Sequence, residues 1–167
     1  MRRRGEETIP GIGGSIPLGR ICMRQEHRRS TRFKVSMAVT LILRDSKSRL
    51  VLTDPVQGTM IDISRHGTRL SLPYIRTDDY HLFYACYDDP AKVIHFEVID
   101  DEEGERLIIP AHPVWFDHIF SGPATHFELG LEFLVPPEDS NIIKLQAFLA
   151  THYPPQGGWL RRLFRRG

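Results

Sequence analysis

A regular alternation of apolar and polar residues around residue 40 is the feature that most constrains the fold. From Phe33 onward every second residue is apolar, and the set comprises Phe33, Val35, Met37, Val39, Leu41 and Leu43. Side chains two positions apart share one face of a strand, so the pattern predicts a half-buried antiparallel strand. The chain therefore contains a sheet that places one face on a core.

Further short apolar runs follow, and turn-forming residues separate them. We expect a second strand region that starts at 49–51 and resumes near Thr59, after a bulge or bend marked by Pro55 and Gly58. The later expected strands are 68–72, 80–87, 93–99, 107–116 and 127–133. No helical periodicity intervenes, which indicates an antiparallel meander. Because closure removes exposed strand edges, we predict an all-β fold, a six- to seven-stranded antiparallel β-barrel.

A helical pattern appears only near the end of the chain. Residues 137–140 read Pro-Glu-Asp-Ser, which is a typical start signal. Apolar residues then recur at helical spacing from Ile142 to Leu149, and Pro154 ends the run. We therefore expect one C-terminal α-helix that lies against the barrel or covers one of its ends.

The chain has 167 residues, of which 41% are hydrophobic and 26% charged, as is ordinary for a single globular domain with tails. Residues 1–23 are rich in Gly, Pro and Arg, and we expect a flexible N-terminal arm. Residues 24–153 would form the barrel and its helix, and 154–167 a basic C-terminal tail. That tail could touch anionic lipid or a partner, but a solvated end is the simpler interpretation.

Cysteine usage and hydropathy indicate a cytoplasmic protein without a transmembrane segment. Only Cys22 and Cys86 are present, and no apolar stretch follows the basic N-terminus. The longest apolar run, 38–43, is far below the roughly 20 residues that a membrane span needs.

Charge is segregated along the chain. Residues 1–34 contain nine Lys or Arg and three Glu, the last nine residues contain four Arg, and 35–158 contain twice as many acidic as basic residues. An anionic ligand would be attracted to the ends rather than the body. This distribution counts against a general DNA- or RNA-binding surface.

Three arginines, Arg28, Arg29 and Arg32, stand directly before the first expected strand. A guanidinium group can grip a phosphate or a guanine edge with two parallel hydrogen bonds. Residues four apart in extended chain span about 13 Å at most. That reach suits a ligand with two phosphates and two bases.

A second motif, Asp62-x-Ser64-x-x-Gly67, lies where the second expected strand ends. Asp62 and Ser64 would share the outer face, whereas Ile61 and Ile63 would point into the core. An outward carboxylate can accept from a guanine ring N–H and amino group, and the hydroxyl can add a further bond. Gly67 would either have a positive φ or occupy a place without room for a Cβ.

The ordered pair of motifs resembles the PilZ domain family, whose members are bacterial receptors for cyclic di-GMP built on a six-stranded antiparallel barrel. Pro113-Val114-Trp115 and the segment 128–133 resemble the family's closing strands, and the likeness covers residues 24–150. Residues 73–91 look long for the family and carry five aromatic side chains.

The resemblance implies a non-enzymatic cyclic di-GMP receptor or effector in bacterial second-messenger signalling, with no cofactor. Its ligand-binding residues would be Arg28 and Arg32 on phosphates and guanines, Arg29 as an auxiliary contact, Asp62 and Ser64 on a guanine, and Gly67 in the turn. Binding would order residues 24–32 against the barrel. The protein partner that reads this state is not indicated by the sequence.

Two other functions stay open. A PilZ-like interaction module would use the aromatic 73–87 region without nucleotide, and a small barrel could bind single-stranded nucleic acid on exposed tyrosines. We see no nucleophile–base pair, so an enzyme is the least favoured class. His112, His118 and His126 lack a ligand pattern, so we expect no metal site. Trp115 is expected to pack in the core.

Overall fold

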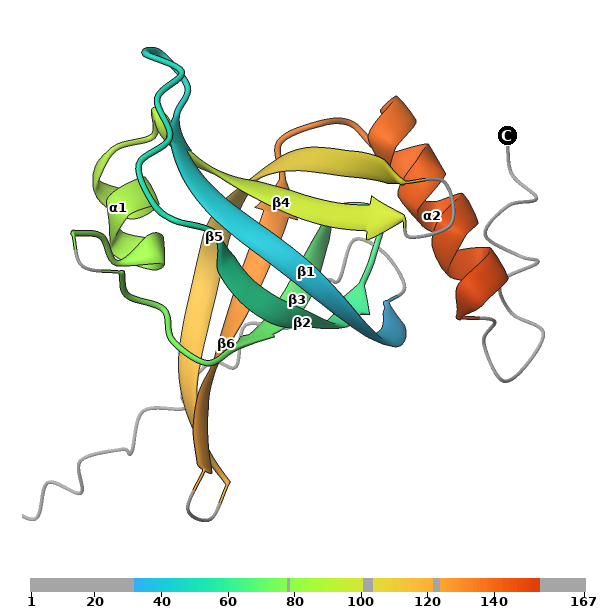
Figure 1. The fold of residues 1–167 in the computed structure, drawn as a ribbon, viewed down its shortest axis with the longest axis horizontal. Coiled ribbons are helices and arrows are strands. Elements are labelled where there is room, and N and C mark those ends of the chain that lie inside the picture. The colour runs from blue at the N-terminus through green and yellow to red at the C-terminus, as the bar shows by residue number, and fades with distance from the viewer. Residues whose placement is uncertain (1–31, 78, 101–103, 122–123, 154–167) are drawn as a thin grey trace, which may run out of the picture.

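Six antiparallel strands close into a barrel in the order β1-β2-β3-β6-β5-β4, and two helices flank it (Figure 1). The computed structural model describes residues 32–77, 79–100, 104–121 and 124–153. The elements are β1 (Phe33–Asp45), β2 (Val56–Ile63), β3 (Gly67–Leu72), α1 (Leu82–Asp88), β4 (Lys92–Asp100), β5 (Glu105–Ser121), β6 (Ala124–Phe133) and α2 (Ser140–His152). Strand class, antiparallel pairing and closure match the prediction, and the described residues form six strands. The predicted simple meander is wrong, because β3 pairs with β6 and β4 pairs with β1.

The alternation in β1 builds one wall of the core as predicted. Met37, Val39, Leu41 and Leu43 are buried, whereas Lys34 on the opposite face is exposed. The inward residues of the other five strands complete the interior, and Phe96 on β4 is its largest fully buried side chain. Burying one such side chain contributes roughly 1.5–3 kcal/mol, so this single core dominates the stability of the domain.

The strand predicted at 80–87 is wrong, because this segment forms the short helix α1. The His81 ring accepts a hydrogen bond from the Tyr84 N–H at 3.4 Å and caps the first turn. Leu82 and Cys86, four residues apart, are the buried residues of the helix. Spacing of four places both on one helical face. The aromatic composition favoured a strand, but burial of this pair against the barrel decides for a helix.

The segment 49–51 is not a strand either. Val51 makes only an isolated bridge to Arg44, and Arg49 has a φ of 62°. The Asp45 carboxylate accepts the Lys47 and Ser48 N–H groups, each at 2.8 Å, and so closes a tight turn after β1. The second strand begins later, at Val56.

The bulge in β2 lies at Ile61 and not at Gly58. Gly58 pairs in register with Val39, but the pairing with β3 steps from Met60 opposite Leu70 to Asp62 opposite Arg69. The extra residue shifts the alternation, so that Met60 and Ile63 are buried while Ile61 is only half-buried. The prediction that Ile61 points into the core with Ile63 is therefore wrong.

The C-terminal helix is confirmed. The Asp139 carboxylate caps α2 by accepting the Asn141 N–H at 2.9 Å. Ile142 and Leu145 are buried, and the side chain of Asn141 donates to the Ile108 carbonyl of β5 at 3.0 Å. These contacts hold α2 beside the barrel (Figure 1). Neither helix of the described chain is long and apolar enough to span a membrane. The predicted arm and tail, 1–23 and 154–167, lie outside the described residues.

Candidate functional site

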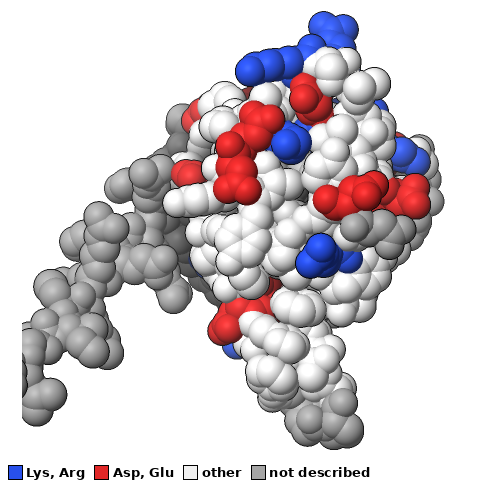
Figure 2. Space-filling model, turned by 90° about the vertical axis from the view of Figure 1, so that its left-hand side faces the viewer, with Lys and Arg blue, Asp and Glu red and all other residues white. Residues whose placement is uncertain are grey.

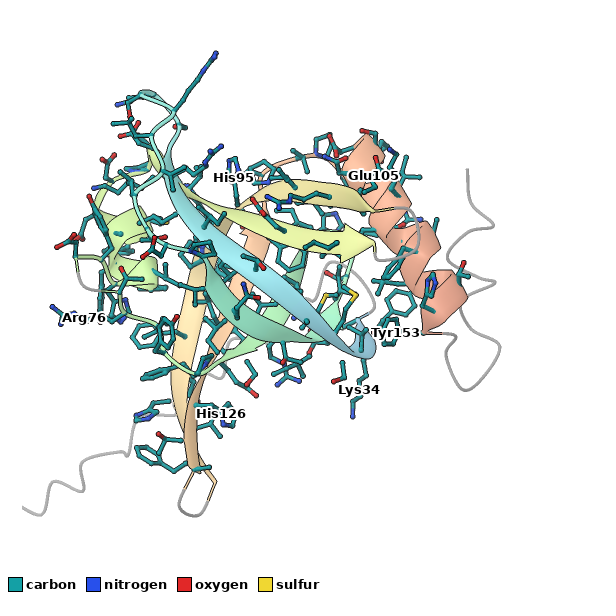
Figure 3. The ribbon with its side chains drawn as sticks, viewed as in Figure 1. Lys34, Arg76, His95, Glu105, His126 and Tyr153 are labelled. Atoms are coloured by element: carbon teal, nitrogen blue, oxygen red, sulfur yellow. The ribbon has the colours of Figure 1, made fainter. Side chains whose placement is uncertain are left out.

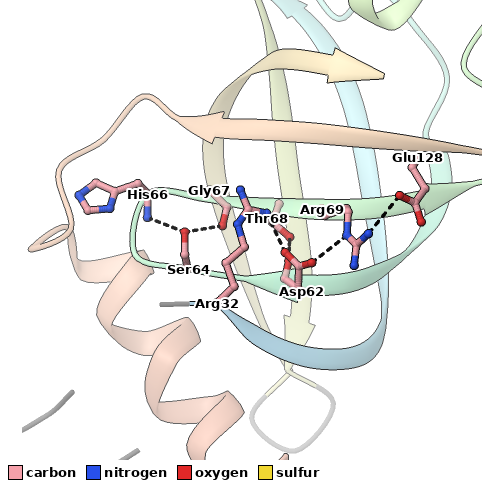
Figure 4. A network of polar contacts seen from close by, with 8 residues as sticks. All are labelled: Arg32, Asp62, Ser64, His66, Gly67, Thr68, Arg69 and Glu128. Carbon is pink, nitrogen blue, oxygen red and sulfur yellow. Dashed lines mark hydrogen bonds and ion pairs between the residues drawn. The ribbon is translucent and has the colours of Figure 1, made fainter. Parts of the chain in front are cut away.

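The Asp62 carboxylate lies at the centre of a polar network on the outer face of the barrel (Figure 4). Arg32 Nη1 donates to Asp62 Oδ1 at 2.7 Å, and Arg69 Nε donates to Asp62 Oδ2 at 2.7 Å. Arg69 also bridges to Glu128 Oε2 at 3.2 Å. The network thus connects Arg32, which directly precedes β1, with residues of β2, β3 and β6.

The bulge at Ile61 and a backbone contact fix the position of this carboxylate. Because of the bulge, Asp62 stands opposite Arg69 instead of pointing into the core. The Thr68 hydroxyl donates to the Asp62 carbonyl at 2.8 Å, and Thr68 is fully buried. The side chain of Asp62 is only 10% exposed. The expectation of an open, outward-facing carboxylate is therefore corrected: two guanidinium groups cover it.

Ser64 organises the turn that follows. Its N–H donates to the Gly67 carbonyl at 2.8 Å, and its hydroxyl donates to the same oxygen at 3.2 Å. The hydroxyl also accepts the His66 N–H at 3.3 Å. Ser64 is 7% exposed. Its one hydroxyl proton is used within the turn, so the side chain retains only acceptor capacity for a ligand.

Gly67 is required by lack of space. A Cβ built there would lie 2.1 Å from the Leu131 carbonyl oxygen, on the neighbouring strand β6. Gly67 is not among the described glycines with positive φ. Of the two expected reasons for a glycine here, the close backbone approach is the one that the structure supports.

Trp115 is not a core residue, contrary to the prediction. A bulge between Pro113 and Trp115 puts Trp115 opposite Gly130, which in turn pairs with Arg69. A Cβ at Gly130 would lie 2.1 Å from the indole Nε1, so the ring lies directly over this glycine. Trp115, Arg69 and Asp62 therefore occupy one outward-facing row across β5, β6, β3 and β2. This row combines donors, a carboxylate and an aromatic ring.

Sequence reasoning missed Arg69 and Glu128, and a signal for Arg69 existed. It is the one basic residue of β3 and lies on the outward face of a hairpin with Asp62. Arg28 and Arg29 lie outside the described residues, so only Arg32 of the first motif has a described position. Arg32 adjoins Phe33, which pairs with Ile63, so the first motif leads directly to the second.

The described chain brings no three His, Cys, Asp or Glu side chains together in a way that could hold a metal ion. The side chains of this row are of kinds that bind ligands. Guanidinium groups bind phosphates and purine edges, carboxylates accept from guanine, and an indole face stacks on a base.

Comparison with known proteins supplies the class. The protein-family model of the PilZ domain matches residues 24–151, most of the chain, and the chain belongs to the PilZ domain family. No curated protein sequence matches it significantly.

Solved structures of PilZ proteins resemble the fold at low identity. The PilZ domain of Escherichia coli YcgR with c-di-GMP is 13% identical, with a TM-score of 0.46 over 74% of this chain and 88% of that one. Borreliella burgdorferi PlzA in complex with c-di-GMP is 17% identical, with a TM-score of 0.46 over 77% and 55%. The PilZ domain of CeSA from a cellulose-synthesizing bacterium is 16% identical, with a TM-score of 0.39 over 70% and 94%.

Proposed function

We propose that this protein is a non-enzymatic receptor for cyclic di-GMP in the bacterial cytoplasm. Arg28 and Arg32 would bind its phosphates and guanine edges, with Arg29 as an auxiliary contact. Asp62 and Ser64 would accept from one guanine beside the turn at Gly67. Family membership supports this assignment, as do the two PilZ structures that contain this ligand.

The observation that carries the proposal is the shared carboxylate of Asp62, held between Arg32 and Arg69. Each carboxylate oxygen has two lone pairs, so Asp62 can keep the Arg69 bond and still accept from a guanine. Arg32 is 35% exposed at the edge of the network and can exchange its bond to Asp62 for one to the ligand. Without ligand, the Asp62 carboxylate is thus paired with two guanidinium groups. With ligand, the bond to Arg32 can open.

Calorimetric titration with cyclic di-GMP tests the proposal. Arg32→Ala and Arg28→Ala should each weaken binding roughly 10- to 100-fold, because a bidentate arginine contact is worth about 1–3 kcal/mol. Arg106→Ala is a matched control, since Arg106 also pairs with a buried acid, Glu97, at 3.4 Å. It should bind like the wild type. Equal affinity in all four proteins would contradict the site assignment.

A second candidate is an interaction module that binds no nucleotide. Rings around α1 support it: Phe83 stacks on Tyr87, and Phe83 and Tyr84 both contact Phe116 of β5. Tyr84 and Tyr87 are 49% and 75% exposed. Figure 2 shows the side of the molecule on which α1 lies. The acidic and basic groups on this side are separate, and most of the surface between them is uncharged. A melting temperature unchanged by excess cyclic di-GMP would favour this candidate.

A further inference from the structure

A groove with a mostly apolar lining and several polar side chains lies on the barrel, away from the row around Asp62. It has a volume of about 690 Å³ and is lined by the end of β1, the turn after it, β4, β5 and the residue Leu134 that follows β6. Arg44 of β1, His95 of β4 and His112 of β5 contribute its polar side chains, together with Arg49 of the turn. Figure 3 shows His95 far from Lys34, which marks the opposite end of β1.

Three nitrogen atoms of side chains that line this groove lack the partners that buried polar atoms normally have. Arg44 Nε, His95 Nδ1 and His112 Nε2 are shielded from solvent and make no hydrogen bond. Within the described residues they are all the buried side-chain nitrogen or oxygen atoms in this condition, and all three belong to residues that line this one groove. Buried polar atoms are almost always hydrogen-bonded, so the cluster points to a shared partner, which for the Arg44 guanidinium must be an acceptor.

The charge of the groove specifies an anion. Arg44 and Arg49 are cations, and the one acid in the lining, Asp45, is engaged by the two N–H groups of its own turn. The same N–H groups hold the pKa of Asp45 low, so its carboxyl does not supply a proton to a ligand. Burial lowers the pKa of His95, and the positive charge of Arg44 lowers it further, against the opposing effect of Glu97.

The number of donors suits an anion that carries several oxygen atoms. The three atoms come from three different strands, and β1, β4 and β5 are neighbours in the barrel. The three atoms are shielded where they stand, so their side chains must turn toward the groove to reach a ligand. Each imidazole can then donate from the free nitrogen in one tautomer, and the guanidinium can donate from Nε. A phosphate has oxygens enough to accept from all three. Apolar lining residues, Pro90, Val93, Pro110 and Leu134, can cover an organic group attached to it.

We propose that this groove is a second binding site, for a small organic phosphate, and that Arg44, His95 and His112 bind its phosphoryl oxygens. Arg44 is ten residues from Lys34 along β1, which corresponds to on the order of 30 Å. The site is therefore separate from the Asp62 row and goes beyond the proposed receptor function.

Nuclear magnetic resonance of the full chain with labelled histidines tests this site. Phenyl phosphate should shift the imidazole signals of His95 and His112 saturably, and inorganic phosphate should do so more weakly because it lacks the apolar group. Arg44→Gln should weaken phenyl phosphate binding roughly tenfold or more. The His126 signal is the internal control and should not move, because His126 on β6 does not line the groove.

Two results with phenyl phosphate and benzoate would overturn the proposal. One is the absence of saturation by phenyl phosphate up to about 20 mM, because a specific site should have a Kd well below that concentration. The other is equal binding of benzoate, which would make the groove a carboxylate site.

A separate titration uses cyclic di-GMP. Arg44→Gln should leave the affinity for cyclic di-GMP unchanged. If cyclic di-GMP itself shifts the His95 and His112 signals, the groove is no separate site. Failure of cyclic di-GMP to bind at all would refute the receptor function alone.

Discussion

Substitution of Gly67 by alanine tests whether the close approach of β3 and β6 supports the candidate site. The added Cβ would lie 2.1 Å from the Leu131 carbonyl oxygen, 3.2 Å from its carbonyl carbon and 3.3 Å from the Glu132 Cα. All three are backbone atoms in a paired strand, so no side-chain rotation can relieve the contact. The strands must separate by about 1 Å to restore an ordinary van der Waals distance.

The cost follows from what that separation disrupts. Gly67 pairs with Glu132 at the start of the β3–β6 ladder, and its carbonyl accepts from Ser64 at 2.8 Å. Overpacking of this kind costs about 1–3 kcal/mol, and loss of one hydrogen bond adds about 1 kcal/mol. We expect a loss of about 2–4 kcal/mol in the free energy of unfolding. Binding of cyclic di-GMP should weaken as well, because the turn holds Ser64.

Urea unfolding followed by circular dichroism measures this loss. Gly104→Ala is the matched control, because a Cβ at Gly104 meets no atom within 4 Å and only the φ of 65° opposes it. A left-handed conformation costs an alanine about 1 kcal/mol. If Gly67→Ala loses no more stability than Gly104→Ala, the argument from close packing is wrong.

Three further predictions concern other groups. Arg69→Ala should lower the free energy of unfolding by about 1 kcal/mol. Arg69→Lys should lower it by nearly as much, since an ammonium group cannot bridge Asp62 and Glu128 with the same geometry. If urea unfolding shows that the lysine variant keeps the full stability of the wild type, the bridging role is refuted. Burial raises the pKa of Cys86 to about 12, so iodoacetamide should alkylate this residue at pH 8 only upon unfolding. Peptide mass spectrometry separates Cys86 from Cys22, and rapid labelling of Cys86 in the folded protein would contradict this. Burial lowers the pKa of His95 in the folded state, so the unfolded chain binds the proton more tightly and stability should fall as the pH drops below about 6.5. His95→Gln should reduce this pH dependence in thermal melts, and an unchanged pH dependence would count against it.

Local sequence signals determined much of the architecture. The period-two pattern of β1 placed Met37 to Leu43 on the core, since alternate residues of a strand share a face. The start and stop signals around α2 located this helix, because Asp139 caps it by accepting the N–H of Asn141, two residues further along the chain. The paired motifs at Arg28–Arg32 and Asp62–Gly67 indicated the family, which the match over residues 24–151 confirms.

Other features depend on contacts between distant residues, which no local pattern records. The segment 80–87 is aromatic enough for a strand, but the burial of Leu82 and Cys86 makes it a helix. Bulges at Ile61 and near Val114 shift the alternation by one residue, and only the register with partner strands reveals them. The bulge near Val114 is why Trp115 lies over Gly130 and not in the core.

The sequence by itself determined the alternating strands, the capped helix and the two PilZ motifs, because those properties arise from residues close together in the chain. Only the tertiary structure decided that Arg69 shares the Asp62 carboxylate with Arg32, and that Arg44, His95 and His112 meet in one groove. The physical reason is register: a side chain's partners across a sheet are set by how whole strands pair, and one extra residue in a strand changes them all.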